Sequence, residues 1–114
     1  MQKPEIGLVG LGTMGAALAL NIAEKGFPIA VWNRTASATE EFFVAAGDLA
    51  GRIVPTKTLA DLAAAMAVPR SIILMVPAGK PVDDMLAALA PHLGPDDLVI
   101  DAGNANSHDT HRRA

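Results

Sequence analysis

Six residues near the N-terminus have the spacing of a phosphate-binding loop. The segment Gly10–Gly15, GLGTMG, matches G-x-G-x-x-G and lies between an apolar run and a segment of helical periodicity. In such a loop the first glycine permits a tight turn, the second lets the backbone approach a pyrophosphate, and the third lets the helix pack closely on the strand. The helix N-terminus adds unpaired N–H groups and a partial positive charge. The loop predicts dinucleotide binding, with a purely structural turn as the alternative.

Asn33, Arg34 and Thr35 indicate which dinucleotide is bound. They stand at the end of the second predicted strand, where NAD-binding units carry an acidic residue that hydrogen-bonds the adenosine ribose. Arginine instead offers a planar set of donors suited to a 2′-phosphate, and no acidic residue occurs between Phe27 and Thr39. We therefore expect NADP in preference to NAD. The alternative is that Arg34 is an ordinary solvated loop residue.

The elements that position these residues follow from the apolar pattern. Short apolar runs predict five strands, at residues 6–9, 28–32, 53–54, 71–76 and 98–100. Helical spacing predicts four helices between them, at residues 14–25, 37–46, 58–66 and 81–90. Ser37 and Glu40 have capping-box spacing, Thr58 is the expected N-cap of the third helix, and residues 109–113 are expected to begin another helix. The alternation predicts one α/β domain, residues 1–114, with a doubly wound, Rossmann-type, mostly parallel sheet and helices on both faces.

The strand order of such a sheet brings later segments to the same crevice. The order reverses beside the first strand, so the carboxyl ends of the strands at 71–76 and 98–100 face the cofactor. This places Met75, Val76, Pro77 and Ala78 against the cofactor and brings residues 101–104 to the same edge. We also expect the fifth strand to leave one sheet edge and an apolar patch bare, with a tendency to self-association.

The composition excludes several other functions. The 114 residues are 51% hydrophobic and 18% charged, with a formal net charge of -3. We therefore expect a globular domain without a nucleic-acid partner. The absence of cysteine excludes disulfides, thiolate metal sites and cysteine nucleophiles and fits a cytoplasmic protein, and the N-terminal apolar run is too short for a signal peptide or membrane span. His108 and His111 lack a third ligand, so no metal is expected.

Four segments together give the chain a more specific resemblance. "GLVGLGTMG", "NIAEKGFPIAVWNRT", "IILMVPAGKPVDDML" and "DAGNANSHDTHRR" follow one another almost without gaps as in 6-phosphogluconate dehydrogenases (decarboxylating). The chain resembles the N-terminal cofactor domain of that family over nearly its whole length. The last two segments make the resemblance specific, because they are outside the general dinucleotide fingerprint.

The resemblance implies a role for each site residue. The pyrophosphate would be held by Gly10, Leu11, Gly12, Thr13, Met14 and Gly15, and the 2′-phosphate by Asn33, Arg34 and Thr35. Val76, Pro77 and Ala78 would lie along the cofactor, and Asn104 would contact both the nicotinamide and the sugar phosphate. Family members usually have Gly-Gly-Asn where this chain has Ala102-Gly103-Asn104.

The resemblance also implies the reaction of the full-length enzyme. An oxidoreductase of the pentose phosphate pathway, expected to be a homodimer, would oxidise 6-phosphogluconate at C3 by hydride transfer to NADP. Loss of carbon dioxide would then give ribulose 5-phosphate. The lysine and glutamate that transfer protons lie, in the family, beyond the segment corresponding to this chain, so no catalytic residue is expected here. Lys80 is the lysine nearest the crevice, but we expect it to be solvated.

Two other functions stay open from the sequence. The neighbouring β-hydroxyacid dehydrogenases share the glycine loop, the Asn-Arg segment and a similar loop after the fourth strand. Residues 101–113 resemble the phosphogluconate branch instead. A stand-alone NADP-binding or regulatory module without catalysis is the alternative from a different class.

Overall fold

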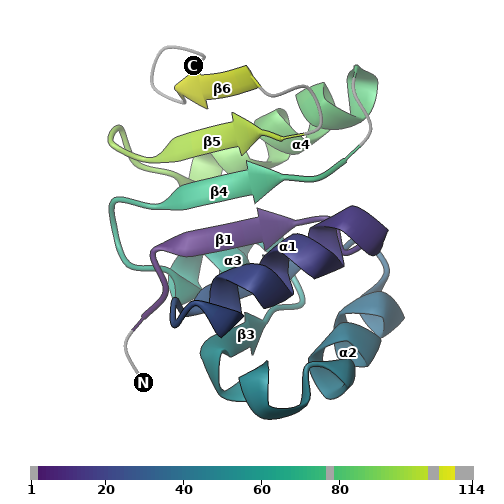
Figure 1. Cartoon of the computed structure of the whole chain (residues 1–114). Coiled ribbons are helices and arrows are strands. Elements are labelled where there is room, and N and C mark those ends of the chain that lie inside the picture. The colour runs from purple at the N-terminus through teal and green to yellow at the C-terminus, as the bar shows by residue number, and fades with distance from the viewer. Residues whose placement is uncertain (1–2, 77–78, 103–105, 110–114) are drawn as a thin grey trace.

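A computed structural model describes residues 3–76, 79–102 and 106–109 of the chain. Its strands are β1 (Ile6–Val9), β2 (Ile29–Trp32), β3 (Ile53–Pro55), β4 (Ser71–Leu74), β5 (Leu98–Asp101) and β6 (Asn106–Asp109). Its helices are α1 (Thr13–Glu24), α2 (Ala36–Ala45), α3 (Leu59–Ala65) and α4 (Lys80–Leu89), with 3₁₀ turns at Gly47–Arg52 and Ala90–His92. The sheet order is β3-β2-β1-β4-β5-β6, and β1 to β5 are parallel (Figure 1). The predicted doubly wound α/β fold is confirmed.

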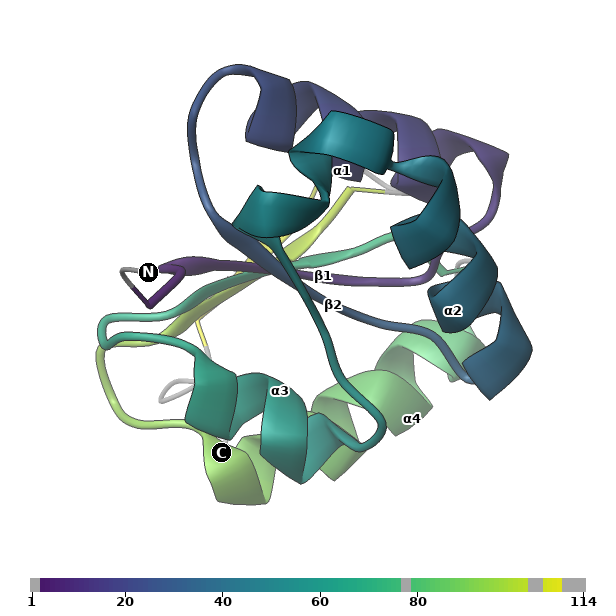
Figure 2. The ribbon, with the colours of Figure 1, turned by 90° about the horizontal axis from the view of Figure 1, so that it is seen from below.

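Helices cover both faces of the sheet, as Figure 2 shows with α1 and α2 on one side and α3 and α4 on the other. Neighbouring residues of β1 belong to different layers: Leu8 packs in the core under α1 and α2, and Val9 in the core under α3 and α4. Both residues are fully buried. Covered faces on both sides explain why these strands read as continuous apolar runs rather than as alternating patterns.

The two predicted helix starts have different outcomes. Thr58 caps α3, because its hydroxyl accepts a hydrogen bond from the Asp61 N–H at 3.0 Å. The capping box expected at Ser37 and Glu40 is wrong. Helix α2 begins at Ala36 with the extended residue Thr35 as its N-cap, so Ser37 already lies in the first helical turn. A serine inside the helix is past the position from which its hydroxyl could cap the free N–H groups.

The chain after β5 also differs from expectation. Asp109, the expected start of another helix, is instead the last residue of β6, which runs antiparallel to β5 with Asp101 opposite Asn106 and Leu98 opposite Asp109. Residues 110–113 lie outside the described part. The expectation of a bare edge on β5 is wrong for the same reason. The backbone groups of that edge pair with the returning chain, which satisfies donors and acceptors that an open edge would leave free.

A buried carboxylate joins the start of β4 to the turn before β5. Asp97 Oδ1 accepts the Arg70 N–H at 2.6 Å, and Oδ2 accepts the Gly94 N–H and Arg70 Nη1, each at 2.8 Å. Arg70 Nε donates to the Ala63 carbonyl at 2.9 Å, which adds the end of α3 to the network. Burial alone would raise the pKa of Asp97, but the hydrogen bonds from Arg70 and Gly94 and the Arg70 charge lower it overall.

Candidate dinucleotide site

The glycine loop occupies the point where the strand order reverses. It follows β1, whose neighbours in the sheet are β2 on one side and β4 on the other. Gly10 has a φ of +102°, its N–H donates to the Trp32 carbonyl at 2.9 Å, and a Cβ there would collide with the Met75 carbonyl oxygen. Both the left-handed backbone and the close approach of β4 require glycine at this position.

The other two glycines of the loop have contrasting surroundings. A Cβ on Gly15 would collide with the Gly10 carbonyl oxygen, so Gly15 lets α1 pack against the loop. No heavy atom of the described residues, immediate neighbours aside, lies within 4 Å of a Cβ placed on Gly12. Gly12 is also the N-cap of α1, without a side-chain cap and without an acidic residue in the first turn. The helix N-terminus therefore faces open space and suits a pyrophosphate.

The remaining loop residues divide between core and surface. Leu11 is buried in the core under α1 and α2, so its side chain supports the loop. Thr13 and Met14 are exposed in the first turn of α1, Met14 by 74%. Asn33 ties the loop to β2, because its Oδ1 accepts the Leu11 N–H at 2.7 Å and its Nδ2 donates to the Thr35 carbonyl at 3.3 Å. This positioning role of Asn33 was not foreseen from the sequence.

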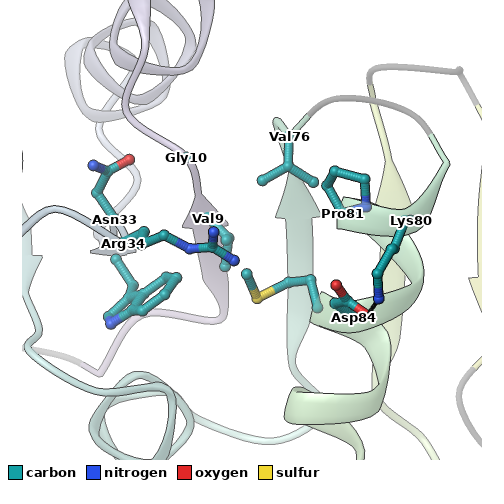
Figure 3. A pocket seen from close by; sticks show the side chains of 10 residues that line it. Val9, Gly10, Asn33, Arg34, Val76, Lys80, Pro81 and Asp84 are labelled. Atoms are coloured by element: carbon teal, nitrogen blue, oxygen red, sulfur yellow. Dashed lines mark hydrogen bonds and ion pairs between the residues drawn. The ribbon is translucent and has the colours of Figure 1, made fainter.

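Arg34 is exposed and points into a cavity beside the loop (Figure 3). Among the described residues the structure shows no ion pair or hydrogen bond of its guanidinium. Thr35, the next residue, is exposed and makes no side-chain capping bond to α2. Arg34 and Thr35 therefore offer a cation and a hydroxyl at the carboxyl end of β2, where the sequence predicted a 2′-phosphate site.

The cavity has a volume of about 360 Å³ and lies between the carboxyl ends of β1, β2 and β4 and the first turns of α4. Its walls are Val9, Gly10, Trp32, Asn33, Arg34, Val76, Lys80, Pro81, Asp84 and Met85. Most of these walls are apolar, with charged groups at Arg34, Lys80 and Asp84. A mostly apolar pocket with a few polar or charged groups is the usual form of a small-molecule or cofactor site.

The segment after β4 contributes to the cavity in part. Val76, which the sequence predicted to lie along the cofactor, lines it. Met75 instead packs with the core under α1 and α2, and its N–H donates to the Val9 carbonyl at 2.8 Å. The predicted strand to Val76 is too long, since β4 ends at Leu74. Pro77, Ala78 and Asn104, the other residues expected at this edge, lie outside the described residues.

Helix α4 supplies a wall that sequence reasoning missed. Pro81, Asp84 and Met85 line the cavity, and so does Lys80, which is 83% exposed and was expected to be solvated. Trp32, also missed, forms part of the opposite wall and donates its Nε1–H to the Lys57 carbonyl at 3.1 Å. The sequence offered one signal for this wall, the spacing of Lys80 and Asp84, because side chains four residues apart are neighbours on the same face of a helix.

Within residues 3–76, 79–102 and 106–109, no group of three metal-ligating side chains comes together. In that part of the chain there is likewise no helix long and apolar enough to cross a membrane.

A parallel sheet with a glycine loop and an uncapped helix at its switch point defines a dinucleotide-binding domain. The family model described as the NAD binding domain of 6-phosphogluconate dehydrogenase matches residues 5–114. The chain belongs to this family.

Individual relatives agree with the family match. The chain is 48% identical to "6-phosphogluconate dehydrogenase, decarboxylating 2, chloroplastic" of Spinacia oleracea, covering 99% of this chain and 21% of that protein. It is 43% identical to "6-phosphogluconate dehydrogenase, NADP(+)-dependent, decarboxylating" of Bacillus subtilis, covering 99% of this chain and 24% of that protein. A Plasmodium falciparum 6-phosphogluconate dehydrogenase structure, described as apo, with NADP+ and with 6-phosphogluconate, matches with a TM-score of 0.80 at 40% identity. The match covers 88% of this chain and 21% of that one, so the chain spans about a quarter or less of these relatives.

Proposed function

We propose that this domain binds NADP and serves as the cofactor domain of a decarboxylating 6-phosphogluconate dehydrogenase. The observation that carries the proposal is the exposed Arg34 at the end of β2, pointing into the cavity beside the glycine loop. A cation at this position attracts a 2′-phosphate, whereas the carboxylate of NAD-binding units would repel one. The names of the Bacillus relative and the Plasmodium structure, which include NADP, support the same cofactor.

Each part of the cofactor has a matching part of the site. The free N–H groups at the start of α1 would hold the pyrophosphate over Gly12, and the cavity would take the adenosine end. Arg34 and Thr35 would bind the 2′-phosphate. Val76, Pro77 and Ala78 would lie along the cofactor, and Asn104 would contact the nicotinamide. When bound, NADP supplies the hydride acceptor for oxidation of a sugar hydroxyl.

The proposal extends to the whole enzyme. We propose a homodimeric cytoplasmic protein of the pentose phosphate pathway that converts 6-phosphogluconate to ribulose 5-phosphate, with Asn104 reaching both cofactor and substrate. The part played by this chain is to bind and orient NADP. The proton-transferring lysine and glutamate belong to the remaining three quarters of such an enzyme.

The test of the cofactor assignment is the Arg34→Ala protein. We expect it to bind NADP about 10- to 150-fold more weakly than the wild type, because a charge-assisted contact contributes roughly 1.5 to 3 kcal/mol. NAD binding should change little. Calorimetric titration with both cofactors measures the difference, with Lys25→Ala, an exposed cation after α1, as the charge-matched control. Equal losses for NADP and NAD would contradict the assignment.

A second expectation concerns the chain by itself. We expect these 114 residues to bind NADP but to leave 6-phosphogluconate unoxidised, because turnover needs a proton acceptor within hydrogen-bond reach of the sugar hydroxyl. Among the described residues that line the cavity, the amine of Lys80 and the carboxylate of Asp84 are the candidate proton-transfer groups, and they are paired with each other. Absorbance of NADPH at saturating NADP and 6-phosphogluconate, followed over a range of pH, is the measurement. Turnover at the rate of an ordinary dehydrogenase would show that this expectation is wrong.

A further inference from the structure

The wall of the cavity opposite Arg34 carries an ion pair. Lys80 is the first residue of α4, and its Nζ lies 3.1 Å from Oδ1 of Asp84, four residues later. The side chains are 83% and 53% exposed. Figure 3 shows Arg34 reaching in from the β2 side and the Lys80–Asp84 pair standing on α4 across the gap. The cavity is therefore lined by two cations and one carboxylate.

The Lys80 ammonium group can readily exchange Asp84 for a stronger anionic partner. Pairs between exposed side chains stabilise a protein only weakly, because water solvates both charges well. A phosphate monoester carries about -1.5 to -2 charges and three strong acceptor oxygens, so it is a better partner for an ammonium group than one carboxylate. Lysine also has a long flexible stem and three donors that can be redirected.

Asp84 acts against such a phosphate in two ways. Its carboxylate holds Lys80 in the present pair, so Lys80 must leave Asp84 to meet a ligand. Once the pair opens, an unpaired negative charge remains in the same wall of the cavity. Asp84 thereby lowers the affinity that Arg34 and Lys80 together could give.

We propose that the Lys80–Asp84 pair tunes how strongly the site prefers a 2′-phosphorylated adenosine cofactor over its unphosphorylated counterpart. Lys80 is the second cation for the 2′-phosphate, and Asp84 weakens phosphate binding by competing for Lys80. This inference rests on the proposed function, because it takes the cavity to be the adenosine end of the NADP site.

The experiment compares four variants of the 114-residue chain by calorimetric titration with NADP and with NAD. We expect Asp84→Asn to tighten NADP binding roughly two- to fivefold, and Lys80→Ala to weaken it roughly three- to tenfold. NAD binding should stay unchanged in both. In the double variant the gain from losing Asp84 should be smaller than in Asp84→Asn alone, because only the repulsion between Asp84 and the phosphate is then removed. Both single effects should shrink as ionic strength rises, because these groups are exposed.

Asp83→Asn is the matched control. Asp83 is the preceding residue on α4, it is exposed, and it does not line the cavity. Removing its charge should leave the affinities for NADP and NAD as they are. An equal gain from Asp83→Asn would mean that any lost negative charge helps, and it would overturn the specific role of Asp84.

Three further results would also overturn the inference. They are unchanged NADP affinity in Asp84→Asn, an equal change for NAD, and a gain from Asp84→Asn that is undiminished when Lys80 is already alanine. The last result would mean that Asp84 acts by its charge alone and not through Lys80. If the wild type prefers NADP and loses that preference in Arg34→Ala while these variants are neutral, only this inference fails. If the wild type shows no preference for NADP, the proposed function fails with it.

Discussion

The Gly12→Val protein is expected to fold normally and to bind NADP at least about a hundredfold more weakly than the wild type. Space is open around a Cβ at Gly12, and its φ of -67° is ordinary for any residue, so the valine causes no strain in the unliganded protein. The side chain instead fills the space over the start of α1. Losing one or two charge-assisted hydrogen bonds to the pyrophosphate, at roughly 1.5 to 3 kcal/mol each, accounts for the size of the effect.

Calorimetry and circular dichroism together test this expectation, with Gly15→Val as the contrasting variant. A side chain at Gly15 would collide with the Gly10 carbonyl, so that variant should lose stability by roughly 1 to 3 kcal/mol or more through overpacking. The two variants should therefore differ: Gly12→Val loses cofactor binding, and Gly15→Val loses folding stability. If a folded Gly12→Val protein bound NADP as tightly as the wild type, the loop would be only a structural turn.

Asp97→Ala is expected to lower the free energy of unfolding by about 3 to 5 kcal/mol, the usual cost of breaking a buried ion pair by removing one partner. Asp97 is 3% exposed, and its loss leaves two backbone N–H groups and Nη1 of Arg70 without the carboxylate that accepts from them. Whole domains have only about 5 to 15 kcal/mol of stability, so the variant should be close to unfolding. Urea denaturation measures the loss, and Asp96→Ala, its exposed neighbour, is the control.

The same carboxylate should make stability depend on pH in the acid range. The folded-state pKa of Asp97 is lowered, so its stabilisation is complete above the unfolded-state value of about 3.9 and disappears as the pH falls through the folded-state value. We expect the stability of the wild type to fall more steeply below about pH 4 than that of Asp97→Asn, which has no carboxylate to protonate. Parallel curves for the two proteins between about pH 5 and pH 2 would contradict this assignment.

The sequence was sufficient for the parallel part of the sheet and insufficient for its last strand. Strands β1 and β4 are almost wholly apolar, and their pattern indicates burial whatever lies around them. Strand β6 has the sequence NSHD, which lacks both an apolar face and β-branched residues. Its conformation depends on pairing with the open edge of β5, and local sequence does not encode such a tertiary partner.

The site was predictable on the side of the glycine loop and much less so on the side of α4. Gly10, Gly15 and Arg34 belong to motifs whose geometry is local, between one strand and the next helix. Asp84 and Met85 line the cavity only because the switch in strand order places β4, which leads into α4, beside β1, from which it is distant in sequence. Asp97 presents a similar difficulty, because nothing in the sequence distinguishes it from the exposed Asp96.

Trp32 gives the domain a built-in optical signal. It is the only tryptophan of the chain, which has no tyrosine, so selectively excited emission comes from a single indole. That indole forms part of the cavity wall, and its Nε1–H is fixed to the Lys57 carbonyl at 3.1 Å. A ligand in the cavity changes the polarity around the ring, and a reduced nicotinamide absorbs light in the range where indole emits. Occupancy of the cavity should therefore register as quenched tryptophan fluorescence, so that affinities can be followed by titration without any attached dye.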